Sequence, residues 1–250
     1  MNGMLTAVRK GILRRGVQTI RDPHLDQEGG KGFPLILRDS CTGCGECGRA
    51  CPAGAISLDD EMTIDLGRCQ VCHACVDACP VKAMVDSGRS VVAVAGREEL
   101  LEDVDKLEEL RRSRIRGRGG RSLSIREVDA GSCNGCEVEV NALSNAIHDM
   151  ERMGMRIVAS PRHADMLLVT GPVTEHMLQP LRGTYEAMPE PRLVVAMGSC
   201  AISGGMWHDT LKGVAEVIPV DVFVPGCPPR PQAIVQGILL ALERQVNAQR

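Results

Sequence analysis

The stretch from Arg38 to Pro80 reads RDSCTGCGECGRACPAGAISLDDEMTIDLGRCQVCHACVDACP. It contains the pattern C-x2-C-x2-C-x3-C-P twice, and each cysteine of the second copy follows its counterpart by 28 residues. The cysteines are Cys41, Cys44, Cys47 and Cys51 in the first copy and Cys69, Cys72, Cys75 and Cys79 in the second. A duplication of this pattern is typical of a segment that binds two 4Fe–4S clusters.

The spacing also predicts which cysteines share a cluster. Three thiolates separated by two residues each can wrap one cluster, whereas the fourth begins a helix that points away and reaches the other cluster. The first cluster is therefore expected on Cys41, Cys44, Cys47 and Cys79, and the second on Cys51, Cys69, Cys72 and Cys75. Zinc sites and disulfides are the alternatives, but zinc sites usually have two separated CxxC pairs, and disulfides require an oxidising compartment. From about Gly32 to Asp86 the segment resembles the two-cluster bacterial ferredoxins.

The composition limits the kind of protein further. A ferredoxin-like module uses only part of the 250 residues, so a second domain is expected. The net charge of −3 argues against nucleic acid as the main partner. No apolar run approaches the roughly 18 residues of a membrane span. The Arg14-Arg15 pair could suggest a twin-arginine export signal, but the polar stretch GVQTIRDP follows it in place of the apolar segment that such a signal needs. Twelve cysteines in such a chain predict metal ligands in a reducing cytoplasm.

Four segments are predicted along the chain. They are an N-terminal amphipathic helix with its lead-in (1–31), a two-cluster α+β ferredoxin domain (32–95), a helix with an Arg/Gly linker (96–121) and an α/β domain (122–250). The helix Met1–Ile20 has a basic face, so it lies either on a membrane surface or membrane partner, or on its own ferredoxin domain. Arg114–Arg121 is interpreted as the linker, with solvated or docking arginines in preference to an RNA-binding segment.

From Ser122 onward, strands are predicted to alternate with helices. The expected strands are Leu123–Val128, Met155–Ala159, Met166–Thr170, Leu193–Ala196 and Asp221–Val224, after an earlier short strand at Val91–Ala95. The expected helices are Arg97–Arg112, one from the DAGSCNGCEVEV segment to about Met153, Thr174–Met188 and Pro231–Val246. This order predicts a flavodoxin-like α/β fold with a parallel sheet covered on both faces.

The four remaining cysteines follow the ends of the predicted strands. Cys133 and Cys136 come after the first strand of the α/β domain, Cys200 after the fourth and Cys227 after the fifth. Ligands of such sheets bind beyond the carboxyl ends of the strands, so the three loops are expected to meet at one metal site. Four thiolates fit a third 4Fe–4S cluster or a zinc ion. A third cluster is preferred because it would continue an electron path from the first two.

The region from Asp129 to the C-terminus resembles the small subunit of membrane-bound, energy-converting nickel–iron hydrogenases of the formate hydrogenlyase type. It is also similar to the cluster-bearing subunit of respiratory complex I. The stretches that carry the resemblance are DAGSCNGCEVE (129–139), PRHADMLLVTGPVT (161–174), EPRLVVAMGSCAISGG (190–205) and PVDVFVPGCPPRP (219–231). Complex I subunits typically have adjacent cysteines at the first position, whereas two residues separate Cys133 from Cys136, which favours the hydrogenase branch. The whole chain thus resembles a fusion of two subunits that are usually separate.

The resemblance implies partners and further site residues. The third cluster would lie against a large subunit with a nickel–iron centre, beside a ferredoxin- or formate dehydrogenase-type electron module and integral membrane subunits, on the cytoplasmic side of the cell membrane. All twelve cysteines are assigned to three 4Fe–4S clusters, so no nickel site is expected here. Glu139 is a candidate for proton movement, with Asp129 and Glu137 behind it, and Arg230 could hydrogen-bond near the cluster. Structural roles such as capping or pairing are the alternatives for each of these side chains.

A few other side chains carry weaker signals. His73 stands between two ligand cysteines and is expected at the surface. His163 is interpreted as a structural hydrogen-bonding residue. Trp207 and His208 follow a Gly-Gly turn and are candidate contacts for a partner.

Three hypotheses about function follow. The preferred one is an electron-transfer subunit of a membrane-associated nickel–iron hydrogenase complex. The second is the equivalent subunit of a complex I-like oxidoreductase without nickel that reduces a quinone or another acceptor. The third is a scaffold protein that binds zinc at the site of Cys133 and only positions its partners. Such a chain would contain about eight iron atoms instead of about twelve.

Overall fold

The computed structural model describes residues 31–58, 62–101, 103–104, 106–107 and 122–248. The predicted helix Met1–Ile20 and the predicted linker Arg114–Arg121 lie outside these residues. Of the predicted helix Arg97–Arg112, the structure describes a 3-10 helix at Arg97–Leu101 and a few residues beyond it.

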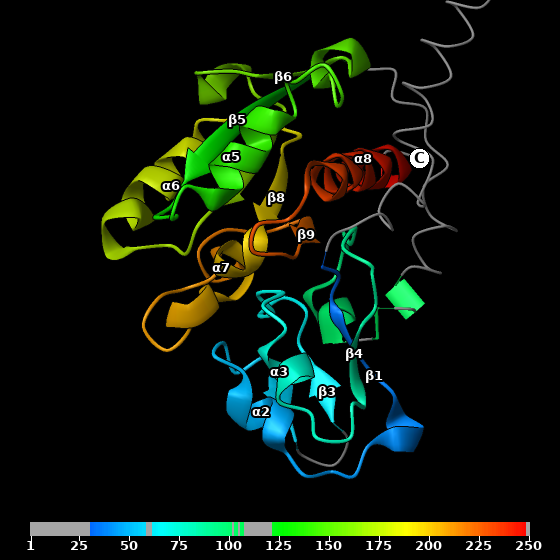
Figure 1. The fold of residues 1–250 in the computed structure, drawn as a ribbon. Coiled ribbons are helices and arrows are strands. Elements are labelled where there is room, and N and C mark those ends of the chain that lie inside the picture. Colours follow the sequence, from blue (N-terminus) through cyan, green and yellow to red (C-terminus); the bar gives the residue numbers. More distant parts are fainter. Residues whose placement is uncertain (1–30, 59–61, 102, 105, 108–121, 249–250) are drawn as a thin grey trace, which may run out of the picture.

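The cysteine-rich segment folds as two similar halves, each with a short helix and strands (Figure 1). Its elements are β1 (Pro34–Ile36), α2 (Glu46–Ala50), β2 (Ile56–Ser57), β3 (Thr63–Ile64), α3 (Ala74–Asp77) and β4 (Met84–Asp86). Strand β1 pairs with β4, and β2 pairs with β3, both antiparallel. The predicted small α+β cluster domain is therefore confirmed, and the structure adds that its strands are antiparallel.

The duplication is visible in the backbone angles as well as in the cysteines. Residues 28 positions apart share a positive φ in three pairs: Gly43 (69°) with Val71 (55°), Gly45 (76°) with His73 (67°), and Gly54 (56°) with Lys82 (53°). The first half uses glycine at all three positions, for which this region carries no steric penalty. The second half places side chains there, and the β-branched Val71 is the most unfavourable of them. The second loop therefore keeps the shape of the first at an energetic cost of order 1–3 kcal/mol per strained residue.

The C-terminal part contains a parallel sheet of five strands with the spatial order β6-β5-β7-β8-β9. The strands are β5 (Leu123–Asp129), β6 (Met155–Ile157), β7 (Met166–Thr170), β8 (Leu193–Met197) and β9 (Val222–Val224). Every pairing in the sheet is parallel. In chain order this is the 2-1-3-4-5 arrangement of flavodoxin-like folds, so the predicted fold class is confirmed.

The helices of this part are α5 (Gly135–Ala142), α6 (Leu178–Glu186), α7 (Gly198–Ser203) and α8 (Pro231–Ala248). The prediction of one helix continuing to about Met153 was wrong, because α5 ends at Ala142. Beyond this end the backbone forms i→i−3 turns, and the Asn145 Oδ1 atom accepts hydrogen bonds from the backbone N–H groups of Ile147 and His148, which would otherwise continue the helix. Such local bonds offer the backbone an alternative to the helix. The chain then forms turns and a 3-10 helix at Met150–Met153 before β6.

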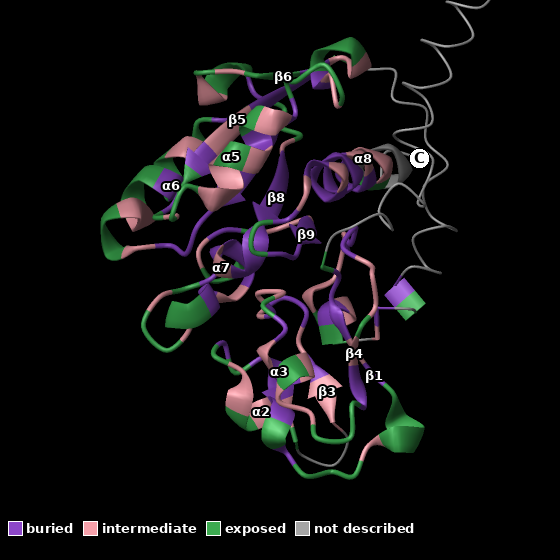
Figure 2. Ribbon diagram, in the orientation of Figure 1, coloured by how far each residue is buried: buried purple, intermediate pink, exposed green. Residues whose placement is uncertain are grey.

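The two faces of the sheet carry separate layers of buried side chains. On β7, Met166 and Leu168 face a layer shared with α5 and α8, whereas Leu167 and Val169 face the opposite layer. This alternation follows from the period of two along a strand. Figure 2 shows the buried residues concentrated along β8, β9 and the sheet side of α8.

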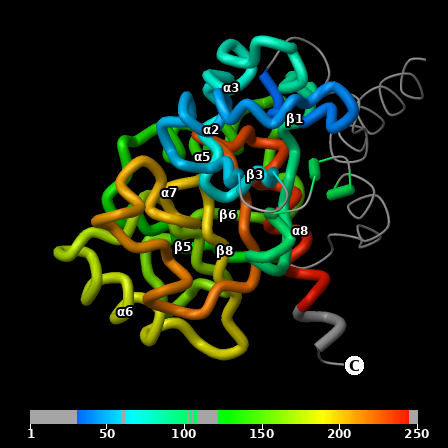
Figure 3. Tube along the Cα trace, turned by 90° about the horizontal axis from the view of Figure 1, so that it is seen from below, coloured from blue at the N-terminus to red at the C-terminus, as the bar shows by residue number. Residues whose placement is uncertain are grey.

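The opposite layer continues without interruption into the cysteine-rich segment. Phe33, Leu66 and Leu100 of the N-terminal part belong to the same buried cluster as Leu167 and Val169. Figures 1 and 3 show the cysteine-rich segment lying against the α7 side of the sheet. The two parts of the chain therefore share one apolar core instead of meeting only through a linker.

Two further contacts join the parts. Val94 and Phe223 exchange backbone hydrogen bonds of 3.0 and 2.8 Å, so the predicted strand Val91–Ala95 is reduced to a single antiparallel bridge on the edge strand β9. On the other side, the Ser203 hydroxyl on α7 donates to the carbonyl of Gly67 at 3.1 Å. Gly67 lies two residues before the ligand candidate Cys69, so α7 directly contacts the loop that carries the second copy of the cysteine motif.

An ion pair stabilises the same loop. The Arg97 guanidinium donates to the Asp65 carboxylate at 2.6 Å, and these side chains are only 30% and 16% exposed. We expect Arg97→Ala to lower the free energy of unfolding by about 2 kcal/mol. The substitution removes the closer of the two arginines that pair with this largely buried carboxylate, since Arg68 lies 3.6 Å from Asp65. Denaturant titration of the purified chain measures this. Arg152→Ala is the control, since its ion pair with Asp149 is 50% and 38% exposed and should contribute less than about 1 kcal/mol. Equal losses in the two variants would contradict the prediction.

Candidate iron–sulfur centres

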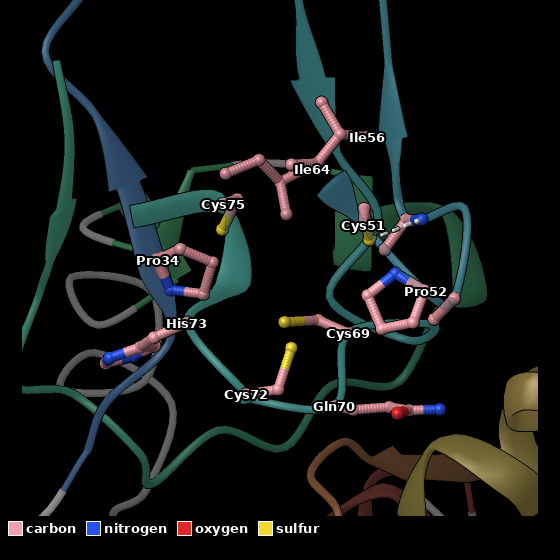
Figure 4. Close-up of a pocket in the computed structure, with 12 residues that line it drawn as sticks. Pro34, Cys51, Pro52, Ile56, Ile64, Cys69, Gln70, Cys72, His73 and Cys75 are labelled. Carbon is pink, nitrogen blue, oxygen red and sulfur yellow. Dashed lines mark hydrogen bonds between the residues drawn. The ribbon is translucent and has the colours of Figure 1, made fainter. Parts of the chain in front are cut away.

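The structure brings Cys51 of the first copy to three cysteines of the second. The sulfur atoms of Cys51, Cys69, Cys72 and Cys75 lie around one small cavity (Figure 4). Burial is the main cause that raises the pKa of Cys69 to about 12 and of Cys75 to about 11, and the neighbouring Cys51 and Cys72 sulfurs act in the same direction on both. This is the exchange of the fourth cysteine that the spacing predicts for the second cluster.

The other cysteines of the first copy form a second group. Burial raises the pKa of the Cys47 thiol, and Cys41 and Cys44 lie close enough to add to that effect. Cys79 sits among backbone N–H groups near the start of β4, of which Met84 contributes most to lowering its pKa. The structure thus groups three of the four ligands expected for the first cluster, and the fourth, Cys79, remains a predicted ligand.

Backbone N–H groups point at the sulfurs in both copies. Ala55 donates to Cys51 Sγ at 3.3 Å, and its counterpart Ala83 donates to Cys79 Sγ at 3.2 Å. These pairs also lie 28 positions apart. Hydrogen bonds of this kind stabilise negative charge on sulfur and contribute to the reduction potential of a bound cluster.

The third group lies at the carboxyl end of the sheet, as expected from the strand order. Cys133 and Cys136 follow β5, Cys200 is in α7 directly after β8, and Cys227 follows β9. Burial raises the pKa of Cys136 strongly, and Cys200, Cys227 and Cys133 all act on it in the same direction. The three loops therefore converge, and they do so because all of the parallel strands end at the same edge.

Glycines without side chains leave room for the third group of sulfurs. A Cβ atom on Gly198 would lie 2.7 Å from Cys136 Sγ, and one on Gly205 would lie 2.6 Å from Cys200 Sγ. Both glycines have positive φ angles, 91° and 61°. No other residue type would combine this backbone with this space. Neither glycine was predicted from the sequence, although both belong to the MGSCAISGG stretch.

The chemistry of these donor sets fits iron–sulfur clusters. Buried thiols disfavour the thiolate form, so a cationic group is needed to keep several thiolates together. When bound, a cluster supplies one-electron redox chemistry, and the chain supplies its ligands, hydrogen bonds and burial. Among the described residues, no three His, Cys, Asp or Glu side chains are grouped as they would be around a single metal ion. A cubane cluster binds its thiolates through four different iron atoms, so it requires a wider arrangement.

A carboxylate is built into the wall of the third site. Glu137 accepts a hydrogen bond from Ser132 Oγ at 2.7 Å and another from Thr170 Oγ1. Burial raises the pKa of Glu127 on β5, and Glu137 adds to this shift. Glu139, the carboxylate preferred from the sequence, is half-buried on α5. Asp129 also accepts hydrogen bonds from the backbone N–H groups of Gly131 and Ser132 in the loop before Cys133. Hydrogen bonds therefore connect Glu137 and Asp129 to the site, and the role of Glu139 in proton movement stays a prediction.

The second and third sites are neighbours. Burial raises the pKa of the Cys227 thiol, and the sulfurs of Cys133 and Cys72 act in the same direction. Cys72 belongs to the second group of sulfurs, whereas Cys227 belongs to the third. The contact between Gly67 and Ser203 lies in the same junction.

The remaining candidates are distributed around these sites. His73 is buried, contrary to the expectation that it is exposed, because its Nε2 atom lies 2.8 Å from the Gly32 carbonyl oxygen. His163 is exposed in a 3-10 helix, and Trp207 is 52% exposed after α7. The Arg230 carbonyl accepts backbone hydrogen bonds in the first turn of α8.

Within the described part of the chain, no helix has both the length and the apolar character needed to cross a membrane.

Comparison with known proteins gives matches to both parts of the chain. Residues 40–83 match the 4Fe–4S dicluster domain. Residues 133–241 match the family described as NADH ubiquinone oxidoreductase, 20 kDa subunit. The two matches together include all twelve cysteines.

Three relatives illustrate the range of this family. A probable membrane-bound hydrogenase subunit of Pyrococcus furiosus is 49% identical over 128 residues, which are 50% of this chain and 77% of the relative. Formate hydrogenlyase subunit 7 of Escherichia coli is 42% identical over 134 residues, 51% of this chain and 52% of the relative. An NADH-quinone oxidoreductase subunit of Citrifermentans bemidjiense is 46% identical over 114 residues, 45% of this chain and 67% of the relative.

These matches agree with the fold and with the convergence of cysteines at the end of the sheet. The chain belongs to the family of the NADH ubiquinone oxidoreductase 20 kDa subunit, and it carries a 4Fe–4S dicluster domain on the N-terminal side of that family's domain.

Proposed function

We propose that this chain holds three 4Fe–4S clusters and relays electrons between a donor module and the active site of a nickel–iron hydrogenase large subunit in a membrane-associated complex. The family itself establishes that the chain is an iron–sulfur electron-transfer subunit of hydrogenase or complex I-like oxidoreductases. The names of two relatives, a membrane-bound hydrogenase subunit and a formate hydrogenlyase subunit, support the choice of partner.

The observation that carries the proposal is the series of three cysteine groups. Cys51 joins the second copy of the motif, and Cys72 of that same group lies near Cys227 of the third. Electrons that enter at the first group would pass to the second through the duplicated fold and then cross the domain junction to the third. The ligands would be Cys41, Cys44, Cys47 and Cys79, then Cys51, Cys69, Cys72 and Cys75, then Cys133, Cys136, Cys200 and Cys227.

The surface beside the third site is suited to a large partner subunit. Cys133 is exposed, and Val138, Met206 and Trp207 are each more than half exposed near the ligands in sequence. Single apolar residues are common on surfaces, but exposed apolar side chains that follow ligand candidates in the chain, together with an exposed Cys133, favour a covered interface. The large subunit would shield the cluster there, and Glu139 would be available for proton movement at the same contact.

A second candidate function is the equivalent role in a complex I-like oxidoreductase without nickel. The observation in its favour is the 46% identity to a subunit of an NADH-quinone oxidoreductase. The separation of Cys133 from Cys136 by two residues favours the hydrogenase partner.

Metal analysis of the complex distinguishes these functions. We expect the complex purified anaerobically through this chain to contain nickel near one atom per large subunit, and this chain purified alone to contain about twelve iron atoms. The same iron content without nickel in the complex would support the complex I-like function. An iron content of about eight with zinc would contradict a third cluster. Hydrogen uptake and quinone reduction by the same preparation then identify the acceptor.

A further inference from the structure

Ser199 places a hydroxyl group in the interior beside the third site. It is the second residue of α7, between Gly198 and the ligand candidate Cys200, and it is 1% exposed. Its Oγ atom is buried and has no hydrogen-bond partner among the described residues. A buried polar group without a partner is unfavourable, because it has lost its hydrogen bonds to water. The hydroxyl is therefore expected to face an acceptor that forms at the third site, such as a deprotonated ligand sulfur.

The backbone of Ser199 holds this side chain in place. Its N–H group donates to the Gly226 carbonyl at 2.8 Å, which joins the start of α7 to the loop that carries Cys227. Its carbonyl accepts a hydrogen bond from Ser203 Oγ at 3.0 Å. Both backbone groups are thus satisfied within the protein, and only the hydroxyl is left to interact with the site.

The position of Ser199 places its hydroxyl between two ligand candidates, because Ser199 precedes Cys200 in α7 and its N–H group binds the carbonyl of Gly226, the residue before Cys227. Burial raises the pKa of Cys200 to about 11, and it also raises the pKa of Cys227. Ser199 acts in the opposite direction on the pKa of both thiols, because a hydroxyl can donate a hydrogen bond to a thiolate.

We propose that the Ser199 hydroxyl donates a hydrogen bond to the Cys227 sulfur of the third cluster and raises the reduction potential of that cluster. This inference rests on the proposed function, because it requires a cluster on the third group of cysteines. Ser199 would change the reduction potential of the cluster without being a ligand, since its hydroxyl acts through the cysteine sulfur.

The physical reason is the charge that an added electron brings. Reduction increases the negative charge on the cluster and its ligand sulfurs, so a hydrogen bond to sulfur stabilises the reduced form more than the oxidised form. Burial of the site strengthens this difference, because water does not compete for the sulfur. A higher potential at the third cluster would draw electrons from the dicluster domain toward the partner.

The test compares reduction potentials in the full chain within its complex. Redox titration followed by electron paramagnetic resonance gives the midpoint of each cluster, and Cys200→Ala identifies the signal of the third one by its loss. We expect Ser199→Ala to shift that midpoint to a more negative potential, and Ser199→Thr, which keeps a hydroxyl, to stay close to the wild type. An unchanged midpoint in Ser199→Ala would overturn the proposal.

Ser203→Ala is the matched control on the same helix. Its hydroxyl donates to the carbonyls of Gly67 and Ser199 instead of to a sulfur. The midpoint of the third cluster should therefore stay unchanged in Ser203→Ala. An equal negative shift in both alanine variants would show that packing of α7 sets the potential, and the direct hydrogen bond would be refuted.

Iron content separates the possible failures. If Ser199→Ala loses the third cluster while Ser199→Thr retains it, the hydroxyl is required at the sulfur, and the proposal is supported. If both variants lose the cluster, Ser199 has a packing role and the proposal fails. A wild-type chain with only about eight iron atoms would refute the proposed function itself, whereas about twelve atoms with unchanged potentials would refute only the role of Ser199.

Discussion

Replacing Cys200 with alanine is expected to remove the third cluster and to end electron delivery to the partner subunit, while both clusters of the dicluster domain remain. Cys200 lies in α7 at the convergence of the three loops, and an alanine there leaves three thiolates for four iron atoms. Iron analysis of the chain should fall from about twelve atoms to about eight. Turnover of the complex with its natural acceptor should be abolished.

Cys51→Ala provides the reciprocal variant. Cys51 lies with Cys69, Cys72 and Cys75, so its loss should remove the second cluster and leave the signal of the third one intact. Each variant should therefore lose a different paramagnetic signal. Full activity of Cys200→Ala with its original acceptor would contradict the assignment of the third cluster.

Gly198→Ala is expected to have an effect nearly as large, although it changes no ligand. The φ angle of Gly198 is 91°, and an added Cβ atom would lie 2.7 Å from Cys136 Sγ. The backbone strain alone costs about 1–2 kcal/mol, and the new methyl group would displace the sulfur from its position. We expect loss of the third cluster, measured as about four iron atoms fewer per chain.

Gly183→Ala is the control for this substitution. Gly183 lies within α6, and a Cβ atom there would meet no atom within 4 Å. Alanine in a helix is more favourable than glycine by about 1 kcal/mol, so this variant should keep its full iron content and be slightly more stable. If Gly198→Ala also keeps a full iron content, the prediction is contradicted, because the space between Gly198 and the Cys136 sulfur is then not required for the cluster.

The shared core gives the junction between the domains a functional meaning. Leu66 and Leu100 pack in the same buried cluster as Leu167 of the sheet, and Ser203 on α7 contacts Gly67. The resemblance describes subunits that are usually separate, and a covalent fusion alone would only tether them. The common core holds the loop before Cys69 against the helix that carries Cys200. The spacing between the second and third groups of cysteine sulfurs therefore depends on core packing in addition to chain connectivity.

The secondary structure was predicted best where the pattern was long and regular. The buried strand Met166–Thr170 has the predicted bounds, because a central parallel strand is apolar on both faces. The helix after Cys136 was predicted too long, because the backbone beyond Ala142 forms turns and local hydrogen bonds to the Asn145 side chain that apolar periodicity does not reveal. Val91–Ala95 has the composition of a strand, but only Val94 finds a partner at the edge of the sheet.

The sequence by itself determined the cysteine motif, its duplication and the fold class, because spacing and periodicity are local properties of the chain. It also predicted that Cys51 joins the second cluster, since the direction of a short helix follows from the motif. Only the tertiary structure decided that Cys72 lies within electrostatic range of Cys227, that Gly198 leaves space for Cys136 and that the Ser199 hydroxyl lacks a partner among the described residues. These features depend on contacts between residues far apart in sequence, and no local pattern encodes how distant surfaces pack together.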